Sequence, residues 1–437
     1  MLNGEGYGRF AAARLIETLA DSPVVLLHGP RQSGKTTLAR HVAASRDYGY
    51  LTFDDDATWR SADEDPAGFV ARLPDRVILD EVQRVPGLFT SLKAVVDRQR
   101  TPGRLLLTGS ANVLLIPSLS DSLAGRMEIL RLFPLAQCEL ARRPSGFLDA
   151  LRAGHFATRP VPRLGADLAR RIVAGGYPAA LAREPGRRRA AWYRGYLDTM
   201  VQRDVHELSR ISALDALPRL LSLVAAQTAR LLNVTDLSAP FEVSRPTIRD
   251  YLTLLQRVFL VEELSPWHTN RLSRAVKTPK LHIGDTGLAA ALLDIDAVDL
   301  DANRDLIGQL VETFAYQELR RQASWHDANL AFFHYRDRDN YEVDIVIEQG
   351  GRQVMGVEVK AASTVGRSDF AGLRRLAAAA GDRFVCGVVL YDGEASLGFG
   401  DRLFAVPIRL LWETPVAGDK ASPARAALKS ARASRRR

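Results

Sequence analysis

The chain has 437 residues, which is more than one ordinary hydrophobic core accommodates, so about two to four domains are expected. Hydrophobic residues make up 46% and charged residues 25%, a balance that excludes a mainly disordered chain. No apolar run approaches the roughly 18–20 residues of a membrane-spanning helix, and no signal peptide is visible. Cys138 and Cys386 form neither a disulfide framework nor a zinc motif. We therefore expect a cytoplasmic protein with no membrane partner.

The net charge of +8 is concentrated at the C-terminus, where the segment from Lys420 to Arg437 holds seven basic residues and no acidic one. Residues 416–437 are predicted to be an unfolded basic tail, which either holds an anionic polymer such as DNA weakly or is simply solvated. Only seven of the 59 basic residues are lysines. In such a chain a lysine indicates a position that needs a compact ammonium, and Lys35 and Lys360 both lie in motifs described below.

The first third of the chain alternates strands with helices. An amphipathic helix is predicted over 8–20, and a second helix follows a glycine-rich turn at 29–35. Short apolar strands are predicted over the ranges 24–28, 50–53, 77–80, 104–108 and 128–132. This alternation predicts an α/β fold, a doubly wound parallel sheet occupying residues 1–140.

The glycine-rich turn matches G-x-x-x-x-G-K-[ST] and lies between a predicted strand and a predicted helix. In this context backbone N–H groups wrap phosphate oxygens, Lys35 reaches the β- and γ-phosphates, and Thr36 gives its hydroxyl to Mg²⁺. The alternative is a chance glycine turn before a helix. The predicted nucleotide-binding residues are Gly29, Pro30, Arg31, Gln32, Ser33, Gly34, Lys35, Thr36 and Thr37.

A second motif follows at 77–81, where an apolar strand ends in two carboxylates. Asp80 is predicted to hold the Mg²⁺ shell through water, and Glu81 to polarise the attacking water. An additional strand between the two motifs, ending at Asp54 and Asp55, favours the additional-strand ATPases over GTPases. The alternative for Asp80 and Glu81 is an ordinary acidic turn.

Two further positions follow the next strand. A polar side chain there can sense the γ-phosphate, and both Thr108 and Ser110 are candidates. Arg126 is a candidate finger that stabilises charge on the transferred phosphate across a subunit contact, or else a structural arginine beside a helix.

Residues 20–140 resemble the AAA-type ATPases of bacteria and archaea, since GPRQSGKTT, LDEVQ, LTGSA and LAGR occur in this order. The resemblance implies that ATP is bound with Mg²⁺ and hydrolysed, and that a homo-oligomer can form. By the same likeness, residues 141–215 resemble a helical lid, in which Arg203 and Asp204 either reach nucleotide or pair with each other.

Residues 216–303 are predicted to be winged-helix-like, with two helices, a turn, a third helix capped by Ser244, and a strand. Ser244, Arg245, Thr247 and Arg249 would project from the start of the third helix, where DNA contacts are made. The alternative is a winged helix that contacts only protein.

The last predicted domain, 304–415, carries a pattern of carboxylates beside a lysine. Asp344 lies in an alternating strand, and Glu358 and Lys360 share one face of the next strand. A helix upstream can bring Glu312 to the same point. Such a group can bind Mg²⁺ or Mn²⁺ and orient a water for phosphodiester attack.

This pattern resembles the restriction-endonuclease-like nuclease fold, with its D…E-x-K signature. The resemblance implies that Glu312, Asp344 and Glu358 bind metal and that Lys360 positions water. The whole chain resembles a family of AAA-type ATPases with a C-terminal domain of unknown function. The predicted function is an ATPase coupled to a nuclease-like domain that binds or cleaves DNA. The alternative is a regulatory ATPase whose C-terminal half recognises a protein partner.

Overall fold

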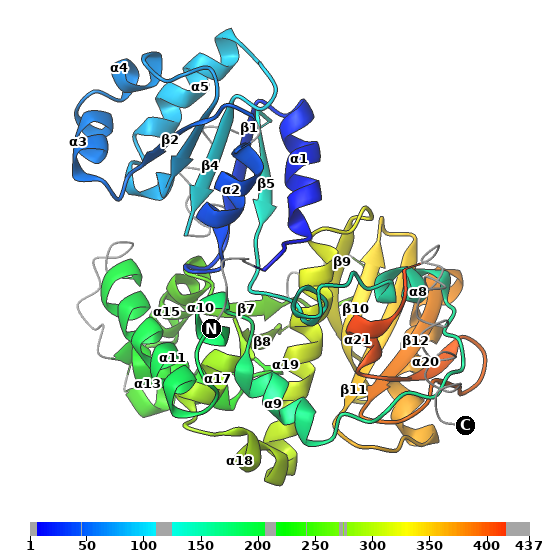
Figure 1. Cartoon of the computed structure of the whole chain (residues 1–437). Coiled ribbons are helices and arrows are strands. Elements are labelled where there is room, and N and C mark those ends of the chain that lie inside the picture. The colour runs from blue at the N-terminus through cyan, green and yellow to red at the C-terminus, as the bar shows by residue number, and fades with distance from the viewer. Residues whose placement is uncertain are drawn as a thin grey trace, which may run out of the picture.

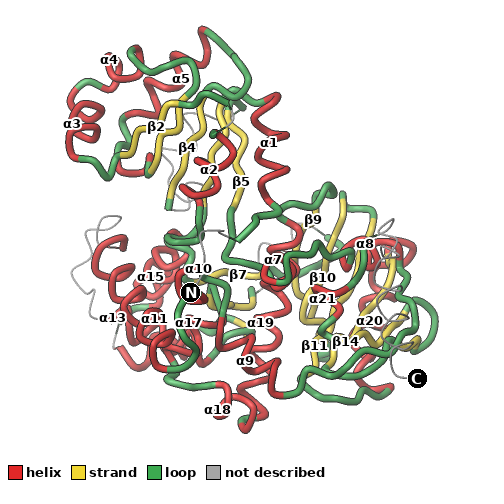
Figure 2. Tube along the Cα trace, in the orientation of Figure 1, coloured by secondary structure: helices red, strands yellow, loops and turns green. Residues whose placement is uncertain are grey.

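The computed structural model describes residues 7–44, 46–110, 125–205, 216–241, 243–270, 274 and 278–416, without the side chains of residues 203–205 and 304. Within these residues the strands form three separate sheets (Figure 2). The N-terminal sheet stands apart from a body that contains the other two (Figure 1). Residues 417–437 of the predicted basic tail lie outside the described residues.

The N-terminal sheet has the order β2-β3-β4-β1-β5, and every neighbouring pair is parallel. This confirms the predicted doubly wound sheet, with strand ends within one or two residues of those expected. The strands are β1 (Val24–His28), β2 (Gly49–Thr52), β3 (Val77–Asp80), β4 (Leu105–Gly109) and β5 (Met127–Arg131).

Both faces of this sheet are covered by helices, because alternate residues of its buried strands point to opposite sides. Val25 and Leu27 of β1 pack with α1 (Ala11–Asp21) and α2 (Lys35–Ala43). Val24 and Leu26 pack on the other face, with α4 (Pro66–Ala71) and α5 (Leu88–Arg98). A short helix, α3 (Asp56–Glu64), follows β2.

The middle of the chain is helical with a small antiparallel sheet in the order β6-β8-β7. The strands are β6 (Arg230–Leu231), β7 (Val261–Leu264) and β8 (Lys280–Ile283). The principal helices are α9 (Ala166–Ala174), α10 (Pro178–Leu181), α11 (Arg187–Thr199), α13 (Ala216–Ala226), α14 (Val234–Ser238), α15 (Arg245–Arg257), α17 (Thr286–Leu292) and α18 (Ala297–Ala302).

The C-terminal sheet is mixed and has the order β13-β14-β12-β11-β10-β9. Its strands are β9 (Leu330–Arg336), β10 (Glu342–Gln349), β11 (Gln353–Lys360), β12 (Phe384–Tyr391), β13 (Leu397–Gly398) and β14 (Leu403–Pro407). The helix α19 (Arg304–Ala323) lies between this sheet and the small middle sheet (Figure 1). The helices α20 (Ala371–Ala380) and α21 (Leu410–Glu413) complete the domain.

The start of the predicted lid range, 141–215, packs on the C-terminal sheet. Helix α8 (Phe147–Ala153) contacts β12, and the Cys386 thiol donates to the Leu151 carbonyl oxygen at 3.2 Å. Arg163 forms a 2.7 Å ion pair with Asp392. The helical body of that range begins only at α9.

Candidate functional site

The glycine-rich turn connects β1 to α2 at the carboxyl end of the N-terminal sheet. Its backbone takes left-handed conformations at Gly34 (φ 97°) and at Gln32 (φ 59°). A Cβ atom on Gly29 would lie 2.1 Å from the carbonyl oxygen of Leu132, so only glycine fits there. The turn therefore has the geometry in which successive N–H groups and the N-terminus of α2 face one anion.

Lys35 and Thr36 begin α2 directly beneath this turn. The buried Lys35 ammonium donates to the carbonyl oxygens of Gly29 and Pro30, both at 3.0 Å. The Thr36 hydroxyl donates to the Asp80 carboxylate at 3.0 Å. The two sequence motifs thus meet at one edge of the sheet, because β1 and β3 run in the same direction on either side of β4.

Three hydroxyl groups surround the Asp80 carboxylate. Besides Thr36, the Tyr50 hydroxyl donates to it at 2.8 Å, and the Thr108 hydroxyl donates to its other oxygen. Ser110 instead contacts the Gln83 amide at 3.0 Å. Of the two candidate sensors, Thr108 is therefore the one that contacts the carboxylate next to the phosphate loop.

Glu81 is held in a left-handed conformation with φ of 59°, which separates its side chain from that of Asp80. Burial raises the pKa of the Glu81 carboxyl, but the charge of Lys35 and a hydrogen bond from Gln83 outweigh it and lower the pKa. Glu81 is therefore ionised, as a group that polarises water must be.

Gln83 was not singled out from the sequence. Its amide nitrogen donates to the Glu81 carboxylate and to the Ser110 hydroxyl, while its amide oxygen accepts from the Ser110 N–H at 3.3 Å. Gln83 thereby links the ends of β3 and β4 at the site. The sequence signal that could have identified Gln83 was its place in the motif LDEVQ, two residues after Glu81.

Arg126 lies outside this cluster. It precedes β5, and the register of Val24 with Met127 places it at the edge of the sheet opposite the glycine-rich turn. There it pairs with Asp97, with a Nη2–Oδ2 distance of 3.1 Å. Its predicted role as a finger across a subunit contact stays a prediction. The side chains of Arg203 and Asp204 lie outside the described residues.

Arg9, in the segment before α1, contacts the glycine-rich turn through its guanidinium group, and we call its contacts the Arg9 clamp. Arg9 donates to the carbonyl oxygens of Ser33 and Phe133, both at 2.6 Å, and forms a 2.9 Å ion pair with Glu139. On the other side of the turn, the Tyr196 hydroxyl of α11 donates to the Arg31 carbonyl oxygen at 3.3 Å. The turn is thus tied to both the N-terminal segment and the helical region.

The start of α15 is presented to solvent. Ser244 caps the helix by accepting from the Thr247 N–H at 3.3 Å, while Arg245 and Arg249 are exposed beside it. Ile248 and Leu252 face the core on the opposite side of the helix. The hydroxyl and guanidinium groups therefore form a polar surface of the kind that contacts phosphates.

The C-terminal carboxylates come together around a lysine that sequence analysis missed. Lys280, the first residue of β8, is 2% exposed, and its ammonium lies 2.8 Å from Glu312 and 3.0 Å from Asp344. The other Asp344 oxygen accepts from the Val359 N–H at 3.0 Å. Lys360 forms a 2.8 Å pair with Glu358. We call Lys280, Glu312, Asp344, Glu358 and Lys360 the carboxylate cluster.

Burial governs the electrostatics of the carboxylate cluster. It raises the pKa of Glu358 to about 8 and that of Glu312 well above its usual range, in each case with the Asp344 charge as a further cause. Burial also opposes ionisation of Asp344, but the Lys280 and Lys360 ammoniums outweigh it and lower the pKa of this carboxyl.

A divalent metal does not fit the carboxylate cluster as it is arranged, because the Lys280 ammonium lies between two of its three predicted ligands. In the described part of the chain, no three His, Cys, Asp or Glu side chains are placed to hold a metal ion. The metal-binding roles of Glu312, Asp344 and Glu358 stay a prediction.

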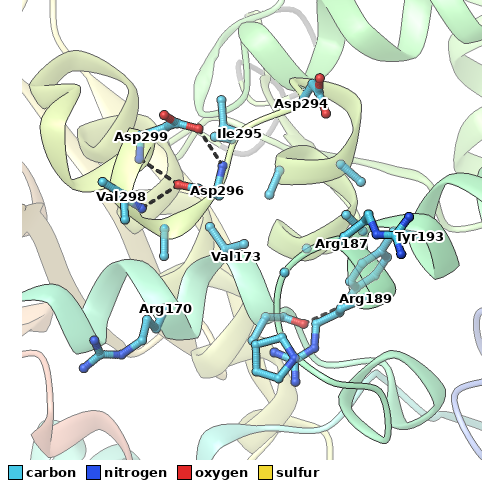
Figure 3. Close-up of a pocket in the computed structure, with 18 of the residues that line it drawn as sticks. Arg170, Val173, Arg187, Arg189, Tyr193, Asp294, Ile295, Asp296, Val298 and Asp299 are labelled. Carbon is cyan, nitrogen blue, oxygen red and sulfur yellow. Dashed lines mark hydrogen bonds between the residues drawn. The ribbon is translucent and has the colours of Figure 1, made fainter.

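A hollow of about 540 Å³ lies apart from both sites, between α9, α11, α17 and α18. Figure 3 shows Arg187 and Arg189 near Tyr193 on one side of the hollow, and Ile295, Asp296 and Val298 on the other. Its lining contains none of the predicted site residues.

Family matches agree with the arrangement of the three sheets. Residues 21–141 match a family described as AAA domain, residues 165–299 a domain of unknown function (DUF8612), and residues 307–411 a second domain of unknown function (DUF4143). Together with the geometry of Lys35, Thr36 and Asp80, the first match supports an AAA-type P-loop ATPase. The second match runs across the boundary between the predicted lid and the predicted winged helix.

Uncharacterized proteins of Mycobacterium tuberculosis and Mycobacterium bovis are each 34% identical over 407 residues, which are 91% of this chain and 83% of the relative. The chain belongs to the family of these mycobacterial proteins. In the described residues, no helix is long and apolar enough to cross a membrane.

Solved structures also match at low identity. A Walker-type ATPase of Pyrococcus abyssi is 15% identical, with 66% of this chain and 99% of that chain covered and a TM-score of 0.41. The Holliday junction branch migration motor RuvB of Thermotoga maritima is 18% identical, with 59% and 89% covered and a TM-score of 0.28.

Proposed function

We propose that this protein binds ATP with Mg²⁺ at the glycine-rich turn and hydrolyses it. The observation that carries this proposal is the convergence of Lys35, Thr36, Asp80 and Glu81 at the carboxyl ends of β1 and β3. Each side chain has a distinct electrostatic role there, and the order of the parallel strands brings them together.

The Thr36 hydroxyl and the Asp80 carboxylate fit Mg²⁺, since both are hard oxygen donors and lie within 3.0 Å of each other. When bound with the nucleotide, Mg²⁺ would neutralise charge that develops on the phosphates. Tyr50 and Thr108 keep the Asp80 carboxylate oriented through their hydroxyl groups. The predicted Mn²⁺ site would lie in the carboxylate cluster. There the Lys280 ammonium donates hydrogen bonds to Glu312 and Asp344, two of the predicted metal ligands.

The protein side chains perform the remaining steps. Lys35 leaves the carbonyl oxygens of Gly29 and Pro30 for the β- and γ-phosphates, which are stronger acceptors for an ammonium. Glu81 accepts a hydrogen bond from the attacking water and polarises it, while Gln83 sets the direction of the carboxylate.

We further propose that α15 contacts DNA, as the third helix of a winged-helix-like domain formed by α13, α14, α15 and the sheet β6-β8-β7. The exposed Arg245 and Arg249 beside the Ser244 cap support this role, because they provide the cationic and hydroxyl groups that bind phosphates. The alternative, a regulatory ATPase that recognises a protein partner, predicts no such phosphate contact.

ATP turnover tests the first proposal. Lys35→Ala should abolish ATP binding and hydrolysis, whereas Lys93→Ala on α5, away from the site, should retain both. Turnover that survives in Lys35→Ala would refute the nucleotide site.

DNA binding by the full chain, measured against salt concentration, tests the second proposal. The Arg245→Glu/Arg249→Glu variant should bind more weakly, and its slope of log affinity against log salt should fall by roughly 0.9 for each phosphate that the protein no longer neutralises. The matched control is Arg187→Glu/Arg188→Glu on the exposed start of α11, which makes the same change in charge. Equally weakened binding in both variants would refute a contact at α15. No binding even at low salt would favour the protein partner.

A further inference from the structure

Lys280 lies buried between the carboxylates of Glu312 and Asp344. The lysine comes from β8 of the middle domain, 32 residues before Glu312 and 64 residues before Asp344. Its side chain is 3% exposed, and those of Glu312 and Asp344 are 12% and 10% exposed. A buried ammonium in contact with two carboxylates is a resident counter-ion, because each of the three charges would be costly to bury alone.

One carboxyl oxygen of the carboxylate cluster has no hydrogen-bond partner. One Glu358 oxygen accepts from Lys360 at 2.8 Å, while the other oxygen is buried and has no hydrogen-bond partner. Glu358 as a whole is 9% exposed. The cluster therefore contains three carboxyl groups beside two ammoniums.

A divalent metal and the Lys280 ammonium compete for the same two carboxylates. The ammonium now donates to one oxygen of Glu312 and one of Asp344, so a metal held by these side chains would place two cations in direct repulsion. An ammonium supplies a compact positive charge with three donors, but it cannot activate water as a Lewis acid does.

We propose that Lys280 is the resident cation of the carboxylate cluster, and that the C-terminal domain holds no divalent metal there while Lys280 is in place. Without that metal the domain lacks the Lewis acid that metal-dependent cleavage of phosphodiesters needs. Lys280 also fastens β8 of the middle domain to α19 and β10, so the same ion pairs join the two domains. This inference depends on neither the ATP chemistry nor the DNA contact proposed above.

Mn²⁺ binding, followed by electron paramagnetic resonance of the free ion, tests this inference. The protein is the full chain without nucleotide and carries Asp80→Asn, which removes the metal ligand at the nucleotide site. With Lys280 present, no Mn²⁺ should bind. Lys280→Met should gain a single Mn²⁺ per chain, and Lys280→Met/Asp344→Asn should lose it again. The matched control is Lys277→Met, which removes a lysine from the same segment of the sequence and should gain no site.

The Asp80→Asn protein with Lys280 intact tests whether a metal binds the carboxylate cluster, even if Lys280→Met fails to fold. One Mn²⁺ bound to that protein and lost in Asp344→Asn would overturn the inference, because the metal would then displace the lysine. Absence of binding upholds it. Should Lys280→Met fold, as judged by its far-ultraviolet circular dichroism and a cooperative unfolding transition, and still bind no Mn²⁺, the claim that Lys280 occupies a metal site is wrong. None of these outcomes changes with the result of the ATPase or DNA experiments.

Discussion

Arg9 donates a 2.6 Å hydrogen bond to the carbonyl oxygen of Ser33, in the centre of the glycine-rich turn. The same guanidinium pairs with Glu139, whose second oxygen accepts from the Ala136 N–H at 3.0 Å. The next residue, Gln137, donates its N–H to Glu318 of α19 at 2.8 Å. A continuous polar path therefore leads from the nucleotide site into the C-terminal half.

Arg9→Ala should weaken ATP binding, because the turn would lose the side chain that holds its backbone from the N-terminal side. We expect a loss of roughly tenfold, equivalent to about 1.4 kcal/mol, near the lower limit for a hydrogen bond from a charged group. ATP affinity measured by titration calorimetry checks this. Arg9→Lys should recover only part of the affinity, since an ammonium cannot reproduce the contacts of the guanidinium fork to Ser33, Phe133 and Glu139. Full affinity in Arg9→Ala would show that the Arg9 clamp is dispensable.

Glu81→Gln should lower kcat by about 10²–10⁴-fold, which is the usual contribution of a general base, and leave ATP binding intact. Gln83→Ala should lower kcat by a smaller factor with KM unchanged, because it removes only the contact that orients the carboxylate. Steady-state kinetics separates these effects. If kcat rises in Gln83→Ala, Gln83 instead holds Glu81 in an unproductive direction.

The nucleotide site could be predicted from the sequence because its determinants are local. Lys35 follows the buried strand β1, and Asp80 is the last residue of the buried strand β3. Parallel strands bring their carboxyl ends to one edge of a sheet. The strands β10 and β11 were predictable for a related reason, because apolar and polar residues alternate along β10 and along the end of β11. In each case the residues of one short segment are enough to predict its secondary structure.

The partners of these segments could not be predicted in the same way. Lys280 reaches Asp344 only because β8 and α19 pack against the C-terminal sheet, and no periodicity within β8 or β10 specifies that contact. The scarcity of lysine was a usable signal, since Lys280 is one of only seven lysines, but it was applied only to Lys35 and Lys360. Arg9 gave no local signal at all, because its partners Ser33, Phe133 and Glu139 are distant in sequence.

Arg321→Met should destabilise the protein strongly. Arg321 lies on α19, is buried, and pairs with Asp285 at 2.9 Å and Glu318 at 3.0 Å, while it also donates to the Leu135 carbonyl oxygen at 2.9 Å. Removing it leaves two buried carboxylates without their cation, which costs about 3–5 kcal/mol in comparable cases. Thermal and denaturant unfolding measure the loss.

The matched control for Arg321 is Arg194→Met. Arg194 pairs with Asp294 at 2.9 Å, but the two side chains are 53% and 83% exposed, so solvent screens the pair. We expect little change in the midpoint of unfolding for this variant. Equal destabilisation by both substitutions would mean that burial of the ion pairs around Arg321 does not set the cost of removing this arginine.

His28 should make the protein less stable in acid. Burial, together with the charges of Arg131 and Lys35, lowers the pKa of His28 to about 3, whereas an unfolded histidine has a pKa of about 6.5. Between these values the unfolded chain binds a proton that the folded chain does not bind. The unfolding free energy therefore falls as the pH drops through this range, by up to about 1.4 kcal/mol per pH unit for this group.

Denaturant unfolding of the full chain between pH 7 and pH 5 measures this dependence. His28→Gln removes the titrating group and should flatten the pH dependence by up to one proton. A residual slope is expected from His282, because burial and the Lys280 charge lower its pKa to about 3 as well. The control is His41→Gln, at an exposed position on α2, which should leave the slope unchanged. An unchanged slope in His28→Gln would mean that His28 takes up its proton in the folded protein as readily as in the unfolded chain.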